Sequence, residues 1–148
     1  MLSYDPRSIS SRVYRSLQAL RNSTTDRTIC DEQKSQAVEL YTYIATWGLL
    51  RLKGEETALG KESKRAVVIC FFQTLSGLAF PEEPNALVGS AGLQKLTQEG
   101  MVASSYLGLT GLALQVAQEF AFWAESLYPK QAENTDRSPD ATEMEAQP

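Results

Sequence analysis

Apolar residues recur at every third or fourth position along most of the chain, a spacing that predicts α-helices. The first helix is expected to begin at Asp5-Pro6, because an aspartate can cap a first turn and proline is tolerated there. Its opposite side displays arginines, and its apolar stripe is Ile9, Val13, Leu17 and Leu20. A polar break at 22–26 separates it from the next helical pattern.

The second pattern starts at a cap on Thr28 or Asp31 and runs through Lys53, where Gly54 is expected to close the helix. Its inward stripe comprises Ala37, Leu40, Tyr41, Ile44, Gly48 and Leu52. Residues 54–64 are charged and contain a further glycine, so a loop or a short helical turn is expected there.

Three further helices complete the pattern. Residues 65–80 include residues that favour strands, but their apolar positions share one helical face and the chain offers no partner strand, so a helix is predicted. Pro81 and Pro84 end it. A short helix capped by Asn85 or Ser90 then reaches Glu99, and a last helix covers 103–128 up to Pro129.

The last helix divides into three sectors when its residues are placed at about 100° intervals. A bulky stripe contains Leu109, Leu112, Val116, Phe120, Trp123 and Leu127, and an adjacent stripe of alanines allows another helix to come near. The third sector is rich in glutamine and glutamate, with Phe122 in its middle. The sequence thus predicts an all-α protein, a compact single-domain helical bundle of about five helices at 1–128.

The composition of the chain predicts a disordered tail and a location in the cell. Residues 129–148 are rich in acidic residues, proline, serine and threonine, so a disordered acidic tail is predicted. The longest apolar run, 66–72, is far shorter than the ~20 residues of a membrane span. The first fifteen residues lack the apolar block of a secretory signal, so we expect a soluble, cytoplasmic protein without a membrane partner.

Candidate chemistry is sparse. The sequence has no histidine, which excludes histidine-based triads and histidine-ligated metals, and its two cysteines, Cys30 and Cys70, are expected to be buried free thiols. The adjacent glutamate pairs at 55–56 and 82–83 fall in expected loops and point to different faces, so solvated charge is favoured over paired-carboxylate catalysis. We therefore expect no enzyme activity, cofactor, metal or small-molecule substrate.

Two features are candidates for contacts with partners. A large exposed aromatic tends to anchor an interface, so Phe122, flanked on its face by Gln115 and Gln118, predicts a subunit contact unless a loop folds back over it. Arg12 and Arg15 share a face and could straddle successive phosphates, although charge alone favours an ordinary solvated surface.

The final helix resembles a known family. Tyr106-Leu-Gly-Leu-Thr110, followed by Leu114, Ala117, Phe120, Trp123, Ala124 and Leu127, is similar to the C-terminal helix of the small subunit of the Cmr complex, the type III-B CRISPR effector. The similarity covers about twenty-two residues without a gap. Family members tend to have charged residues where this chain has Gly108, Gly111 and Phe122, and the segment 54–65 looks like an addition.

This resemblance implies a structural role in antiviral defence. Copies of the small subunit would stack in the inner filament beside other CRISPR effector subunits and support the duplex of guide RNA and target RNA. Candidate phosphate contacts, chosen here by charge and face, are Arg12, Arg15, Arg51, Lys53, Lys61, Lys64 and Arg65. The alternative is a self-associating helical adaptor that does not bind RNA, which the exposed Phe122 and the weakly charged body favour.

Overall fold

The structure is a computed structural model that describes residues 5–129, and within this range every regular element is an α-helix. The helices are α1 (Pro6–Arg21), α2 (Arg27–Trp47), α3 (Leu49–Ala58), α4 (Glu62–Ala79), α5 (Ser90–Thr97) and α6 (Ala103–Leu127). The all-α prediction is confirmed, with six described helices where about five were expected. The predicted tail lies, apart from Pro129, outside the described residues.

The chain begins each of its first two helices with an aspartate cap. The Asp5 carboxylate accepts a hydrogen bond from the Arg7 amide at 2.9 Å, with Pro6 in the first turn as predicted. For α2 the cap is Asp26, not Thr28 or Asp31, and its carboxylate accepts from the amides of Thr28 and Ile29. Both caps satisfy amide groups that a helix N-terminus leaves without an internal partner.

The expected helix through Lys53 is broken earlier, at Gly48. Gly48 has φ +94° and ψ 161°, so the chain turns there and restarts as α3. Helix α3 then continues through Gly54 to Ala58, where a loop had been expected. The two glycines thus have opposite roles from those predicted: Gly48 turns the chain and Gly54 lies inside a helix.

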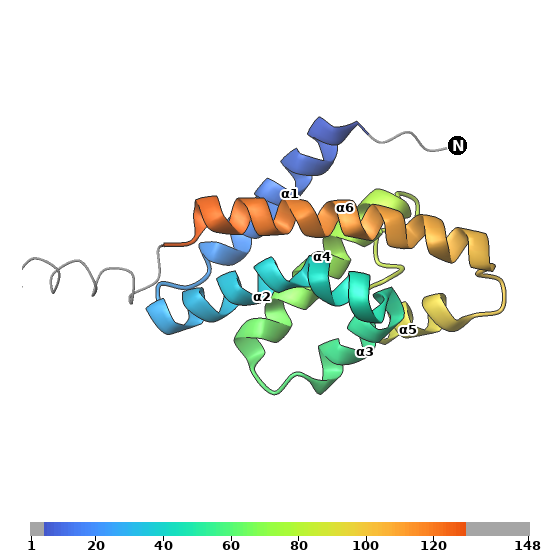
Figure 1. Cartoon of the computed structure of the whole chain (residues 1–148), viewed down its shortest axis with the longest axis horizontal. Coiled ribbons are helices and arrows are strands. Elements are labelled where there is room, and N and C mark those ends of the chain that lie inside the picture. The colour runs from blue at the N-terminus through green and yellow to red at the C-terminus, as the bar shows by residue number, and fades with distance from the viewer. Residues whose placement is uncertain (1–4, 130–148) are drawn as a thin grey trace, which may run out of the picture.

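Most of the buried apolar residues come from the four longer helices, α1, α2, α4 and α6, whose arrangement Figure 1 shows. Helix α6 lies alongside α2 in the opposite direction, and the Lys34–Glu125 ion pair joins the start of α2 to the end of α6. Near the start of α6, the Tyr106 hydroxyl accepts a hydrogen bond from the Leu50 amide of α3. Helix α1 crosses α6 at an angle, and the indole of Trp123 donates to the Ser10 hydroxyl at 3.1 Å. The segment 65–80, with its strand-favouring residues, is helical as predicted.

Aromatic rings fill the centre of this bundle. The Phe71 ring makes edge contacts with Phe72 at 5.3 Å and with Phe120 at 5.6 Å, and all three side chains are fully buried. Most of the apolar stripe of α1 and most of the bulky stripe of α6 are buried in the same core, as the spacing predicted, and Leu20 at the end of the α1 stripe is half-buried. The short α5 and α3 close one end of the bundle.

Candidate interaction surfaces

Arg12 and Arg15 lie on the exposed side of α1, as the sequence predicted. The Arg12 guanidinium packs over Gly77 of α4, so closely that a Cβ there would lie 2.7 Å from its Nη1. Arg15 donates to the Ser11 hydroxyl at 3.0 Å. Both arginines border a hollow of about 430 Å³ together with Arg7, which the sequence pattern did not single out. Asp5 also lines this hollow and forms an ion pair with Arg7 at 2.9 Å. The spacing of the chain could have pointed to Arg7. It precedes Ser11 by four residues and Arg15 by eight, which places the three side chains on one side of a helix.

Two of the remaining basic candidates at the surface, Arg51 and Lys61, already have partners. The Arg51 guanidinium stacks on the Trp47 ring, 4.5 Å from its centroid. Lys61 forms an ion pair with Glu32 at 2.6 Å, and hydrogen bonds from Lys61 and Ser63 lower the pKa of the Glu32 carboxyl. Lys64 is half-buried in a hollow that also holds Glu39 and Glu55. The structure therefore does not bring these residues together with Arg12 into one basic surface.

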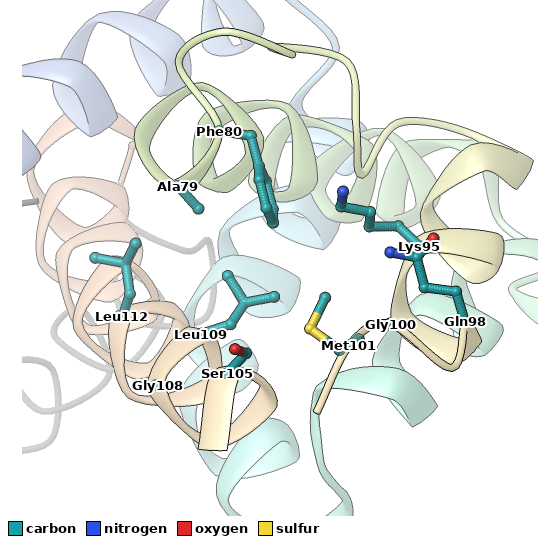
Figure 2. Close-up of a pocket in the computed structure, with 10 residues that line it drawn as sticks. All are labelled: Ala79, Phe80, Lys95, Gln98, Gly100, Met101, Ser105, Gly108, Leu109 and Leu112. Carbon is teal, nitrogen blue, oxygen red and sulfur yellow. The ribbon is translucent and has the colours of Figure 1, made fainter. Parts of the chain in front are cut away.

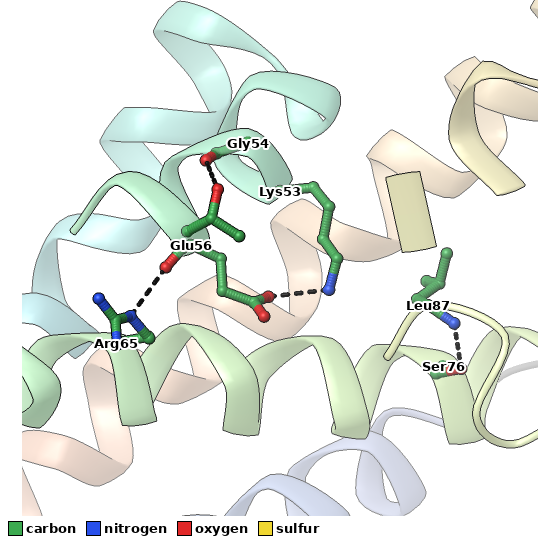
Figure 3. A network of polar contacts seen from close by, with 7 residues as sticks. Lys53, Gly54, Glu56, Arg65, Ser76 and Leu87 are labelled. Carbon is green, nitrogen blue, oxygen red and sulfur yellow. Dashed lines mark hydrogen bonds and ion pairs between the residues drawn. The ribbon is translucent and has the colours of Figure 1, made fainter. Parts of the chain in front are cut away.

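The prediction that Lys53 contacts phosphate is wrong, because Lys53 is buried. Its side chain is 2% exposed, and its ammonium pairs with the Glu56 carboxylate at 2.8 Å (Figure 3). The ammonium also lies 4.6 Å from the centre of the Phe72 ring, and Lys53 Cε packs against Gly92 of α5. This lysine joins α3, α4 and α5 and cannot reach an RNA backbone at the surface.

Arg65 is likewise used within the fold. Its guanidinium donates to the carbonyl oxygen of Glu56 at 3.1 Å (Figure 3). It also donates to the carbonyl oxygen of Leu59. These carbonyls belong to the C-terminal end of α3, where a helix has no internal donors left. Arg65 therefore caps α3, and the charge that marked it as a phosphate contact has a structural use instead.

The outward face of α6 leaves the residues of the predicted subunit contact exposed. Gln115 and Gln118 are exposed, and Phe122 is 59% exposed, so no part of residues 5–129 folds back over it. The Phe122 ring makes an edge contact with Trp123, whose ring in turn lies 4.9 Å from that of Tyr14. At the other end of the face, Leu107 is 68% exposed and was not predicted.

A second exposed apolar region lies at the corner between α2 and α3. Trp47 is 55% exposed and Leu50 is 36% exposed, on either side of the turn at Gly48. The Tyr106 hydroxyl accepts a hydrogen bond from the Leu50 amide at 2.9 Å, which fixes this corner against the start of α6. Val102, one turn before Tyr106, is also 55% exposed.

An apolar cleft of about 470 Å³ opens between the end of α4, α5 and the first half of α6. Figure 2 shows Phe80, Met101, Leu109 and Leu112 around it, with Gly108 on the ribbon of α6 at its edge. Within the described part of the chain, only three polar side chains line the cleft, those of Lys95, Gln98 and Ser105. Lys95 stacks on the Phe80 ring and forms an ion pair with Glu83 at 3.4 Å. The cleft suits an apolar group better than a charged substrate.

The described residues offer little for chemistry. Cys30 and Cys70 are both free and buried, as predicted, and burial raises the pKa of the Cys70 thiol to about 11. Among residues 5–129, no three histidine, cysteine or acidic side chains are placed to hold a metal ion. In the same range, no helix combines the length and apolar character needed to cross a membrane.

Comparison with known proteins gives no relative. No protein-family model, curated protein or solved structure matches the chain. Any functional conclusion therefore depends on the residues themselves.

Proposed function

We propose that this chain is a non-catalytic small subunit of a type III-B CRISPR effector, which packs beside other subunits in the cytoplasm and supports the duplex of guide RNA and target RNA. The observation behind the proposal is α6. Its residues resemble the final helix of that family, and it buries one side against α1, α2 and α4 while its other side is exposed and uncharged from Leu107 to Phe122. Such a helix can hold a fold together and meet a neighbouring subunit at once.

The surface of α1 supports the RNA part of the proposal. Arg12 and Arg15 border one hollow with Arg7, which pairs with Asp5 at 2.9 Å. Arg12 and Arg15 are three residues apart, a spacing that places side chains close together on a helix. Contacts with phosphates through such residues would not depend on RNA sequence and would weaken as salt rises. Arg51, Lys61 and Lys64 lie apart from this hollow and are secondary candidates.

Purification of the tagged protein from its own cells tests the proposal directly. We expect short guide RNAs and further CRISPR effector subunits to accompany it, identified by RNA sequencing and mass spectrometry. Recovery of the chain with neither would refute the proposed function.

Salt dependence tests the arginine hollow. The Arg12→Ala/Arg15→Ala double variant should bind duplex RNA more weakly, and the slope of log affinity against log salt should fall by about one for each phosphate that is no longer bound. Lys95→Ala, which removes a charge from the apolar cleft, is the matched control and should leave that slope unchanged. Equal slopes for all three proteins would remove α1 from the RNA surface.

A second candidate function is a self-associating helical adaptor that does not bind RNA. The exposed Trp47, Leu107 and Phe122 favour it, because apolar residues of this size at a surface commonly anchor protein contacts. This function predicts oligomers of the isolated chain that persist in high salt and retain no nucleic acid. A salt-sensitive affinity for duplex RNA would count against it.

A further inference from the structure

The outward face of α6 has no charge over about four turns. Between positions 107 and 122 the exposed residues are Leu107, Gly108, Gly111, Gln115, Gln118 and Phe122. At about 100° per residue they occupy a sector about 100° wide. The nearest acids do not interrupt it, because Glu119 is half-buried and Glu125 pairs with Lys34 of α2.

Four of these six exposed positions are symmetric about the middle of the face, whereas Gly108 and Gln115 have no exposed counterpart at positions 121 and 114. Leu107 precedes Gly111 by four residues, and Gln118 precedes Phe122 by four, so the middle lies between positions 114 and 115. If a second copy of α6 ran antiparallel about a two-fold axis through that middle, Leu107 would meet the partner's Phe122. Gly111 would likewise meet the partner's Gln118. In a two-fold contact each such pairing occurs twice.

The same arrangement brings Phe122 to the apolar cleft. Gly108 lies at the edge of the cleft. It precedes Phe122 by 14 residues, so the two positions are separated by about 21 Å along the helix axis and by about 40° around it. The two-fold rotation therefore carries the partner's Phe122 to the level of Gly108 and to the same side. With no Cβ at Gly108, the helix leaves the cleft accessible there (Figure 2).

We propose that two copies of this chain pair through the outward faces of α6, antiparallel about a two-fold axis, and that Phe122 of each copy inserts into the cleft beside Gly108 of the other. The proposal explains an exposed aromatic ring and an apolar cleft on the same helix by one contact. It concerns the free chain and does not depend on the proposed function.

A second copy fits this face better than a charged partner does. An uncharged face meets its own copy without repulsion between like charges. The amides of Gln115 and Gln118 each contain donors and an acceptor, so they can hydrogen-bond to the same groups of another copy. A Cβ atom added at Gly108 or Gly111 would meet nothing within 4 Å, so no neighbouring part of the chain itself occupies the space beside these glycines.

Sedimentation equilibrium of the full chain tests the pairing. We expect a dimer at micromolar concentration, and a dissociation constant at least about tenfold larger for Phe122→Ala. Gly108→Leu should be monomeric at that concentration, because its side chain would block the cleft. It should melt no lower than the unchanged protein, because a Cβ at position 108 meets nothing within 4 Å. Trp47→Ala removes an exposed aromatic from another surface and should remain dimeric.

Disulfide trapping tests the antiparallel direction. In the Gly111→Cys/Gln118→Cys variant, each new cysteine should meet its counterpart in the partner, and mild oxidation should give a covalent dimer. Gln118→Cys alone should not crosslink, because the two copies of residue 118 would lie about 10 Å apart along the axis, beyond the reach of a disulfide. The native Cys30 and Cys70 are buried and should not compete.

Three results would overturn the proposal: a monomeric full chain up to about 200 μM, a dimer that Phe122→Ala leaves intact, or efficient crosslinking of Gln118→Cys alone. If deletion of residues 130–148 turned a monomer into a dimer, the chain's own tail would be the occupant of this face, and the proposal would again fail. None of these results bears on whether guide RNA and CRISPR subunits accompany the protein from cells, so the two proposals fail separately.

Discussion

Three helices supply the surroundings of the Lys53 ammonium. Glu56 of α3 provides the opposite charge, Phe72 of α4 provides a ring face, and Gly92 of α5 provides space for the side-chain stem. A charge in such a position requires its partner, since removing one member of a buried pair leaves the other without compensation. The pair is therefore a point where a single substitution should have a large effect.

Lys53→Met should destabilise the protein by about 3–5 kcal/mol, because the Glu56 carboxylate would remain buried without its partner. The double variant Lys53→Met/Glu56→Leu should recover most of this loss, since an apolar pair needs no charge compensation. Guanidinium unfolding curves would measure both. Lys61→Met breaks the exposed ion pair with Glu32 and serves as the control, with a much smaller expected loss. A loss for Lys61→Met as large as that for Lys53→Met would contradict this account.

The difference between Phe122 and Lys53 shows what a sequence can reveal about single residues. The exposure of Phe122 was predictable, because helical spacing alone places it among glutamines on one face. The burial of Lys53 was not, because it depends on Phe72 and Gly92, which are distant in the chain and reach Lys53 only after folding. Charge marks a residue as a candidate, but neighbours from other elements decide whether it reaches the surface.

The break between α2 and α3 shows the same limit for whole elements. Both sides of Gly48 continue the apolar spacing of one helix, and Gly54 looks like a helix end. Contacts with two residues from other parts of the chain explain why the helix breaks at Gly48 and continues through Gly54. The Tyr106 hydroxyl accepts from the Leu50 amide, which as part of a new helix start has no partner within α3, and Arg65 binds the carbonyls at the end of α3.

Alanine at the two glycines should therefore have opposite effects. Gly48→Ala should destabilise the protein by about 1–3 kcal/mol, because residues with a side chain rarely adopt φ +94°. The strain would come from the backbone, since a Cβ there would lie 3.7 Å from the Tyr106 hydroxyl, an ordinary contact. Gly54→Ala should stabilise by about 0.5–1 kcal/mol, because Gly54 lies inside α3 with open space around it. Thermal melting would measure both, and a shift of the same sign would refute this assignment.

For the molecule as a whole, the two exposed apolar surfaces suit different kinds of assembly. A two-fold contact through α6 is closed, because each copy uses its own face to bind the same face of the other. A filament of stacked copies needs two different surfaces that meet head to tail. If α6 faces are paired, the corner formed by Trp47 and Leu50 is an exposed apolar surface that remains available to other subunits. The two-fold contact and a filament contact would then compete only if the filament contact also used the outward face of α6.

Buried acidic groups should make the whole fold sensitive to alkaline pH. Burial raises the pKa of the Cys70 thiol from 9.0 to about 11, and burial also raises the pKa of the Tyr128 hydroxyl, which donates to Gln33 at 2.8 Å. Both groups hold their proton more tightly when folded. Their contribution to stability is therefore complete below pH 9 and is lost as the pH rises through the folded values.

We expect the free energy of unfolding to fall by about 2 kcal/mol between pH 8.5 and pH 11 from Cys70 alone, since a shift of two pKa units corresponds to at most about 2.7 kcal/mol and the folded thiol is only half ionised at pH 11. Denaturant titrations at several pH values would measure this slope. Cys70→Ala lowers stability at every pH by leaving a small cavity, but it should flatten the pH dependence, because the titrating thiol is gone. Tyr128→Phe should flatten it further at the highest pH. An unchanged slope in Cys70→Ala would mean that the thiol is not the group whose ionisation unfolds the bundle.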